Sequence, residues 1–144
     1  MTMKPACAAF VLTLMLPACA HRVATTVEVE PRDELLCAIA GNPSQHDGEE
    51  LVLSATYITD NRHFEMLRNS HCGEGGHILV IGRHGSSDSV KRFYAEQKRI
   101  CLKRDAPAVC NTTAVVEVSG RVRLQPEGVV VLDIEEVRSF RFNK

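Results

Sequence analysis

The regular alternation of residues 116–124 limits the fold more than any other feature of the chain. Val116, Val118 and Val122 alternate there with charged or hydroxyl-bearing residues. A period of two predicts a half-buried β-strand. Gly120 stands in an inward position and predicts a bulge or a tight bend. A strand with one apolar face has to belong to a sheet that buries this face.

A second long strand is expected after a short turn. Residues 125–128 read Gln-Pro-Glu-Gly, with Pro at the second position of the turn, and residues 129–142 return as a strand. The inward pattern of this strand runs from Val130 to Ile134, is interrupted by charged residues and resumes at Phe140. A bulge near Val137 explains this slip of the pattern.

The remaining elements are three shorter strands and two helices. Stretches rich in apolar and β-branched residues predict strands over 51–59, 64–67 and 77–81. The segment 86–102 predicts a helix that is capped by its first residues, with Gln97 as the polar exception on its apolar face. A short helix is expected over 33–41, where an acidic start and a terminal Gly frame an apolar stripe.

This order of elements predicts a mainly β (α+β) fold. Five strands, a helix between strands 3 and 4 and a Gly kink in a long strand resemble an OB-fold-like barrel, here preceded by a short N-terminal helix. Another small β-barrel or a sandwich fits the strands nearly as well. The chain has 144 residues, of which 44% are hydrophobic, so we expect one globular domain and assign it to residues 33–144.

The first twenty residues have the features of an export signal. One Lys precedes an apolar run over residues 6–16, which is too short to span a bilayer as a helix. The next residues, Leu16-Pro17-Ala18-Cys19, resemble the bacterial lipobox. This resemblance implies a signal peptide over residues 1–18, acylation of Cys19 by fatty acids such as palmitate, and cleavage before this residue. Because Ala20 rather than Asp follows, it also implies a cell outer-membrane lipoprotein that faces the periplasm.

Two further expectations concern this N-terminal region. Cleavage after Ala20 is the alternative, and it would give a soluble periplasmic or secreted protein. If Cys19 is the anchor, residues 19–32 form a lipid-anchored tether that could reach roughly 40 Å when fully extended.

Four cysteines remain after removal of the signal peptide: Cys37, Cys72, Cys101 and Cys110. An even number in an exported chain predicts two disulfides, and four cysteines allow three pairings. We favour Cys37–Cys72 and Cys101–Cys110, because chain entropy favours the pairing of near neighbours and Pro107 indicates a reversal between the last two. Four reduced, buried cysteines are the alternative.

A local pattern adds a family resemblance. Cys37-x-Ile39-Ala40-x-Asn42-Pro43 is followed by His46-Asp47-Gly48, a predicted strand and Cys72. This pattern is similar to that of small exported bacterial lipoproteins with an OB-fold-like β-barrel. The resemblance covers most of the mature chain and implies no particular activity.

Histidines and one cysteine gather within the segment 63–84: His63, His71, Cys72, His77 and His84. Imidazole and thiolate ligands suit zinc or copper. The spacings do not match the tight pairs of structural metal sites, however, and Cys72 is assigned to a disulfide, so we predict no metal or other cofactor. If the chain does bind a metal, His71 and His77, which flank a Gly-rich loop, are the candidate ligands.

Four arginines occupy outward positions of the two last strands: Arg121, Arg123, Arg138 and Arg141. If these strands are neighbours, the arginines form a basic band that could bind carboxylates or phosphates. Nearby glutamates favour surface salt bridges instead.

The residue patterns favour binding over catalysis. No Gly-x-Ser-x-Gly motif occurs, and adjacent glutamates point to opposite faces of a strand, so no enzymatic activity is expected. A net charge of −1 and 5% aromatic residues disfavour nucleic acid. We expect a bacterial envelope protein that acts as a non-catalytic binding or assembly module, with a protein or glycan as partner. The alternatives are a periplasmic metal-binding protein and, third, a hydrolase.

Overall fold

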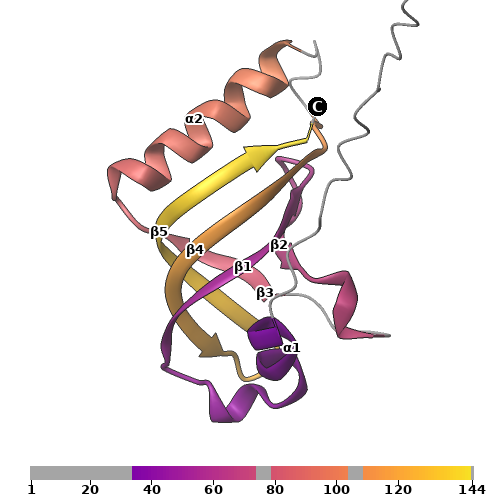
Figure 1. Cartoon of the computed structure of the whole chain (residues 1–144), viewed down its shortest axis with the longest axis vertical. Helices are drawn as coiled ribbons and strands as arrows, with labels where there is room; N and C mark the ends of the chain where they lie inside the picture. The colour runs from indigo at the N-terminus through magenta and orange to yellow at the C-terminus, as the bar shows by residue number, and fades with distance from the viewer. Residues whose placement is uncertain (1–33, 74–78, 104–108, 144) are drawn as a thin grey trace, which may run out of the picture.

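The computed structural model describes residues 34–73, 79–103 and 109–143 (Figure 1). The predictions about the signal peptide, Cys19 and the tether fall outside the described residues. The helices are α1 (Glu34–Gly41), η1 (Pro43–Gln45), η2 (Ser70–Cys72) and α2 (Asp88–Lys103). The strands are β1 (Glu50–Thr59), β2 (Glu65–Arg68), β3 (Leu79–His84), β4 (Thr112–Leu124) and β5 (Val130–Phe142).

The five strands form a closed barrel in the order β1-β2-β3-β5-β4, in which β4 pairs with β1. All neighbours are antiparallel except β3 and β5, which run parallel. The helix α2 lies between β3 and β4 in the chain. The predicted mainly β, OB-fold-like barrel is therefore confirmed, and the pairing of β4 with β1 excludes the sandwich alternative.

The long hairpin of β4 and β5 contains two bulges, one beside Val137, where the sequence predicted a bulge, and one opposite Gly120, where it predicted a bulge or a tight bend. The register shifts leave Glu135 and Arg138 without opposite residues in β4, on either side of Val137. Each bulge adds one residue and bends the strand, which helps it to wrap around the barrel. Gly120 lies at one shift, and a Cβ atom there would collide with the carbonyl oxygen of Asp133. The expectation of a bulge or a tight bend at Gly120 is confirmed by the register shift there.

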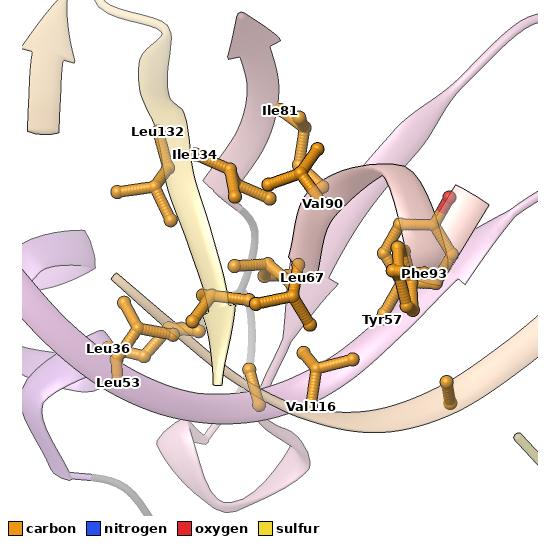
Figure 2. Close-up of a cluster of buried hydrophobic side chains, with 14 of the residues drawn as sticks. Leu36, Leu53, Tyr57, Leu67, Ile81, Val90, Phe93, Val116, Leu132 and Ile134 are labelled. Carbon is orange, nitrogen blue, oxygen red and sulfur yellow. The ribbon is translucent and has the colours of Figure 1, made fainter. Parts of the chain in front are cut away.

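The core lies inside the barrel and continues under both helices. Inward side chains of β1, β4 and β5 meet residues of α1 and α2, and most of them are at most 2% exposed. Burial of each large apolar side chain contributes roughly 1.5–3 kcal/mol. Figure 2 shows the main members of this core: Leu36, Leu53, Tyr57, Leu67, Ile81, Val90, Phe93, Val116, Leu132 and Ile134.

The helix α1 lies at one end of the molecule (Figure 1). Leu36 and Ile39 are both 0% exposed and belong to the core cluster. The predicted disulfide Cys37–Cys72 is confirmed and joins α1 to η2. A helix of eight residues is too short to persist alone, so packing and this bond hold it.

The helix α2 lies at the opposite end (Figure 1). The Ser87 hydroxyl caps it by accepting a hydrogen bond from the Val90 N–H at 3.3 Å. Phe93 packs edge-on against Tyr57, with ring centroids 4.8 Å apart, and stacks on Phe142 at 5.3 Å. The second predicted disulfide, Cys101–Cys110, is also confirmed. Neither α2 nor any other helix of the described residues has the length and apolar character to cross a membrane.

Candidate functional site

A cavity of about 440 Å³ lies at the α2 end of the barrel. Its walls come from the β1–β2 loop, the start of β2, the end of β3 and one side of α2. This volume is in the range of small-molecule sites. A second hollow, of about 630 Å³, lies between α2 and the end of β5, beside Phe140 and Phe142. We take the first as the candidate site because several polar side chains converge on it in one hydrogen-bond network.

The β1–β2 loop is held in one shape by the buried Asp60 carboxylate. Its oxygens accept hydrogen bonds from the backbone N–H groups of Arg62 at 2.9 Å, His63 at 2.7 Å and Phe64 at 3.2 Å. The His63 ring nitrogen Nδ1 donates at 2.6 Å. Partial desolvation acts to raise the pKa of Asp60, but these hydrogen bonds outweigh it and hold the pKa well below the usual range. Asn61 adopts a left-handed conformation (φ 63°), which Asn tolerates better than most residues.

The floor of the cavity is a network centred on the Glu65 carboxylate. The Tyr57 hydroxyl donates to Glu65 Oε1 at 2.5 Å, and Gln97 Oε1 lies 3.3 Å from the same hydroxyl. On the other side, His84 Nε2 lies 2.8 Å from Glu65 Oε2. The Gln97 amide donates to Asn61 Oδ1 at 3.3 Å and so joins α2 to the β1–β2 loop. Both carboxylate oxygens of Glu65 are therefore held, although its side chain keeps 20% exposure.

Two tyrosines adjoin this carboxylate. Burial raises the pKa of Tyr57 and of Tyr94, and the negative charge of Glu65 raises both further. Both phenols therefore stay neutral and keep their protons for hydrogen bonding. The Tyr94 hydroxyl is buried and lies close enough to Glu65 and Tyr57 for short-range contacts with both to raise its pKa, but the angles and distances of a normal hydrogen bond are met with no group of the described residues. Its ring packs against His84, with centroids 4.5 Å apart.

The rim of the cavity differs from the floor. Phe64 is 40% exposed. Arg62 is exposed as well, and none of the ion pairs among the described residues includes it. The rim thus offers an accessible aromatic ring and an available cation, whereas the floor offers fixed donors and acceptors.

The structure brings two of the histidines that the sequence grouped to one cavity. His63 and His84 line the same cavity, and each contacts a carboxylate of its own, Asp60 and Glu65 respectively. His71 lies exposed in η2, and His77 falls outside the described residues. Within the part of the chain that the structure describes, no group of three or more potential ligands could hold a metal ion. Since Cys72 forms a disulfide, it is not available as a ligand.

The candidate arginines lie on the strands as predicted, and Arg121, Arg123 and Arg138 contact carboxylates. Arg123 donates to Asp133 at 2.7 and 3.0 Å, and these hydrogen bonds lower the pKa of Asp133. Arg121 pairs with Glu50 and donates to the Gly48 carbonyl at 3.1 Å. Arg138 approaches Glu136 at 3.5 Å. Arg141 is exposed in β5. These contacts neutralise much of the expected basic band and favour the salt-bridge interpretation.

The sequence patterns did not point to Glu65 and Tyr94, which line the cavity, or to Tyr57, which lies behind it and donates to Glu65. The sequence signals that did fall on the cavity were His63 and His84, grouped as possible metal ligands, and Gln97, which interrupts the apolar face of a helix. The structure gives the reason: Gln97 is only 3% exposed and faces Tyr57 and Asn61 rather than an apolar neighbour. A buried polar residue needs such partners.

Comparisons with protein-family models, with curated proteins and with solved structures return no match for this chain, so the candidate site rests on its own geometry.

Proposed function

We propose that the protein is a bacterial envelope lipoprotein that acts as a non-catalytic binding or assembly module, with the cavity beside α2 as its binding site. The proposed anchor is the acylated Cys19, in the outer membrane and facing the periplasm. The proposed partner is an envelope protein or glycan. One observation carries the binding role: a loop fixed by hydrogen bonds and a helix line a polar cavity at one end of a small barrel.

The state of the ionisable groups supports binding over catalysis. Glu65 is held by Tyr57 and His84, and His63 is held by Asp60. Such mutual pairing fixes side chains in place for recognition. A general base, in contrast, needs an accessible lone pair aimed at a substrate proton.

The location of the cavity in the barrel agrees with this role. OB-folds that bind oligosaccharides or oligonucleotides use the loop between the first two strands. The β1–β2 loop supplies four residues to the cavity: Asn61, Arg62, His63 and Phe64. This likeness is one of fold only, so the binding role is inferred from the cavity.

The anchor is tested by the intact mass of protein extracted from the membrane fraction, before and after reduction with alkylation. We expect the mass of residues 19–144 plus acyl groups, with four alkylations only after reduction. A mass that begins at His21 would contradict the anchor and indicate a soluble periplasmic or secreted protein.

The binding role is tested by photo-crosslinking in intact cells. A benzophenone-bearing phenylalanine replaces Phe64 at the rim of the cavity or, as a matched control, Leu102 on α2, which is 61% exposed and does not line the cavity. We expect one reproducible protein or glycan adduct from position 64 and none from position 102. The same adducts from both positions, or none from either, would contradict a binding site at the cavity.

A further inference from the structure

We propose that the cavity beside α2 binds a pyranose sugar that carries a carboxylate, with the sugar hydroxyls against the floor and the carboxylate at Arg62. The proposal rests on the binding role proposed above and names the class of ligand. It follows from three properties of the cavity: mixed hydrogen-bonding capacity on the floor, aromatic surface at the wall and rim, and one available cation.

The floor matches hydroxyl groups, which both donate and accept hydrogen bonds. A carboxylate has about four acceptor positions, and Glu65 uses two of them for Tyr57 and His84. The Tyr94 hydroxyl is buried beside Glu65 and Tyr57 without a hydrogen bond of normal geometry among the described residues, so its donor capacity is unused. Gln97 uses one of its two amide hydrogens for Asn61. Fixed acceptors and donors therefore lie side by side, whereas a phosphate site needs donors and a cation site needs acceptors.

The aromatic residues of the cavity match the apolar face of a sugar ring. One face of a pyranose ring presents C–H groups and packs well on an aromatic ring. Phe64 is 40% exposed at the rim, and the ring of Tyr94 lines the wall. The apolar Ile81 completes this side of the cavity.

The charged residues of the cavity indicate which kind of hydroxyl-rich ligand fits. Arg62 is the cation of the rim without an ion pair among the described residues, and a guanidinium pairs well with a planar carboxylate. The negative Glu65 on the floor disfavours a phosphate group there. It disfavours nucleic acid as well, because single-stranded nucleic acids are bound by several stacking rings along a positive groove.

The test uses the mature protein, isotope-labelled and held in a detergent without a sugar headgroup. The probes are the methyl glycosides of D-glucuronic, D-galacturonic and D-mannuronic acid and those of the three corresponding neutral hexoses. We expect at least one uronide to shift the backbone amide signals of residues 60–65 and of α2 around Tyr94 in a saturable manner. We expect the matching neutral hexoside to bind roughly two- to fivefold more weakly, as the loss of one exposed ion pair predicts.

Two variants separate binding from folding. Tyr94→Phe removes a hydroxyl that makes no hydrogen bond in the described structure, so the fold should persist while uronide affinity falls roughly five- to tenfold. Arg62→Gln should lower the affinity for the uronide roughly two- to fivefold and leave the neutral hexoside unchanged. Arg92→Gln is the matched control, because Arg92 is exposed on α2 and lines the second hollow instead.

Each contrary result overturns a stated part of the proposal. No saturable shift with any of the six probes overturns the sugar. Equal affinity for charged and neutral probes, or an unchanged uronide affinity in Arg62→Gln, overturns the carboxylate at Arg62. Shifts confined to the second hollow, beside Phe140, overturn the location. A specific crosslink from position 64 without any sugar binding would refute this inference and leave the proposed function intact.

Discussion

The two ends of the barrel are closed by different chemistry (Figure 1). At the α1 end, Leu36 and Ile39 are fully buried, and the disulfide Cys37–Cys72 fastens the helix. At the α2 end, the aromatic contact of Phe93 with Tyr57 lies beside a network of buried polar groups and a cavity. Figure 2 shows Leu36 at one side of the core and Phe93 at the other.

The two ends differ in what their side chains can contribute to stability and to recognition. Apolar side chains at the α1 end release water on burial and need no partners. Polar groups at the α2 end have to be paired, and a buried group without a partner costs roughly 1–3 kcal/mol. The Tyr94 hydroxyl is such a group. We infer that the α1 end mainly holds the fold and that the α2 end retains hydrogen-bonding capacity for a ligand.

The largest expected effect comes from removing the disulfide of the α1 end. Cys37→Ser with Cys72→Ser opens a loop of 35 residues and should reduce the free energy of unfolding by about 4 kcal/mol on chain-entropy grounds. Cys101→Ser with Cys110→Ser opens a loop of 9 residues and should cost about 2.5 kcal/mol. Urea unfolding in an oxidising buffer measures both. Equal losses, or the reverse order, would contradict the view that the α1 end depends more on its disulfide.

A single apolar truncation tests the same end without touching a disulfide. Leu36→Ala should lower the free energy of unfolding by about 3 kcal/mol, since Leu36 is 0% exposed and a cavity would remain. The control is Leu102→Ala, which removes a leucine that is 61% exposed and should change stability by at most about 0.5 kcal/mol. If both variants unfold at the same urea concentration, burial of Leu36 in α1 does not stabilise the core.

The pH dependence of stability sharpens the comparison at the α2 end. The unfolded chain releases the phenolic protons of Tyr57 and Tyr94 near the ordinary pKa of 10.0, whereas the raised pKa values keep them bound in the folded state. This contribution to stability is therefore fully present below pH 10 and is lost as the pH rises above it. The loss is about 1.4 kcal/mol per pH unit for each tyrosine.

The variant Tyr57→Phe with Tyr94→Phe removes this alkaline dependence. Its free energy of unfolding should fall less steeply above pH 10 than that of the wild type, even though it starts lower because the Tyr57 hydrogen bond is missing. Urea unfolding at several pH values between about 9 and 11 gives the two slopes. Parallel slopes would show that the phenols are not protected by the fold.

The smallest expected effect concerns the strand surface near the α1 end. Arg121 and Glu50 form an ion pair in which the side chains are 47% and 60% exposed. Arg121→Gln should therefore change the free energy of unfolding by at most about 0.5 kcal/mol. The difference should shrink in about 1 M salt, where the screening length is near 3 Å. A loss above about 1 kcal/mol that salt leaves unchanged would assign this arginine a structural role.

Much of the fold could be predicted because its signals are local. The alternation of residues 116–124 and the Ser87 cap are set by neighbouring residues, and both appear in the structure. The two bulges were predicted only in their approximate positions. Gly120 and the slip of the apolar pattern near Val137 indicated the irregularities, but only the pairing of β5 with β4 shows that Glu135 and Arg138 are the unpaired residues.

The sequence by itself determined the five strands, the helices α1 and α2 and the pairing of Cys101 with Cys110, because backbone periodicity, turn residues and short loop closure act over a few residues. Only the tertiary structure decided the cavity. Its hydrogen bonds join residues 8 to 40 positions apart, such as Tyr57 to Glu65 and Gln97 to Tyr57. Closure of the barrel and the docking of α2 on β5 bring these residues together, and no local pattern records where two distant segments will meet.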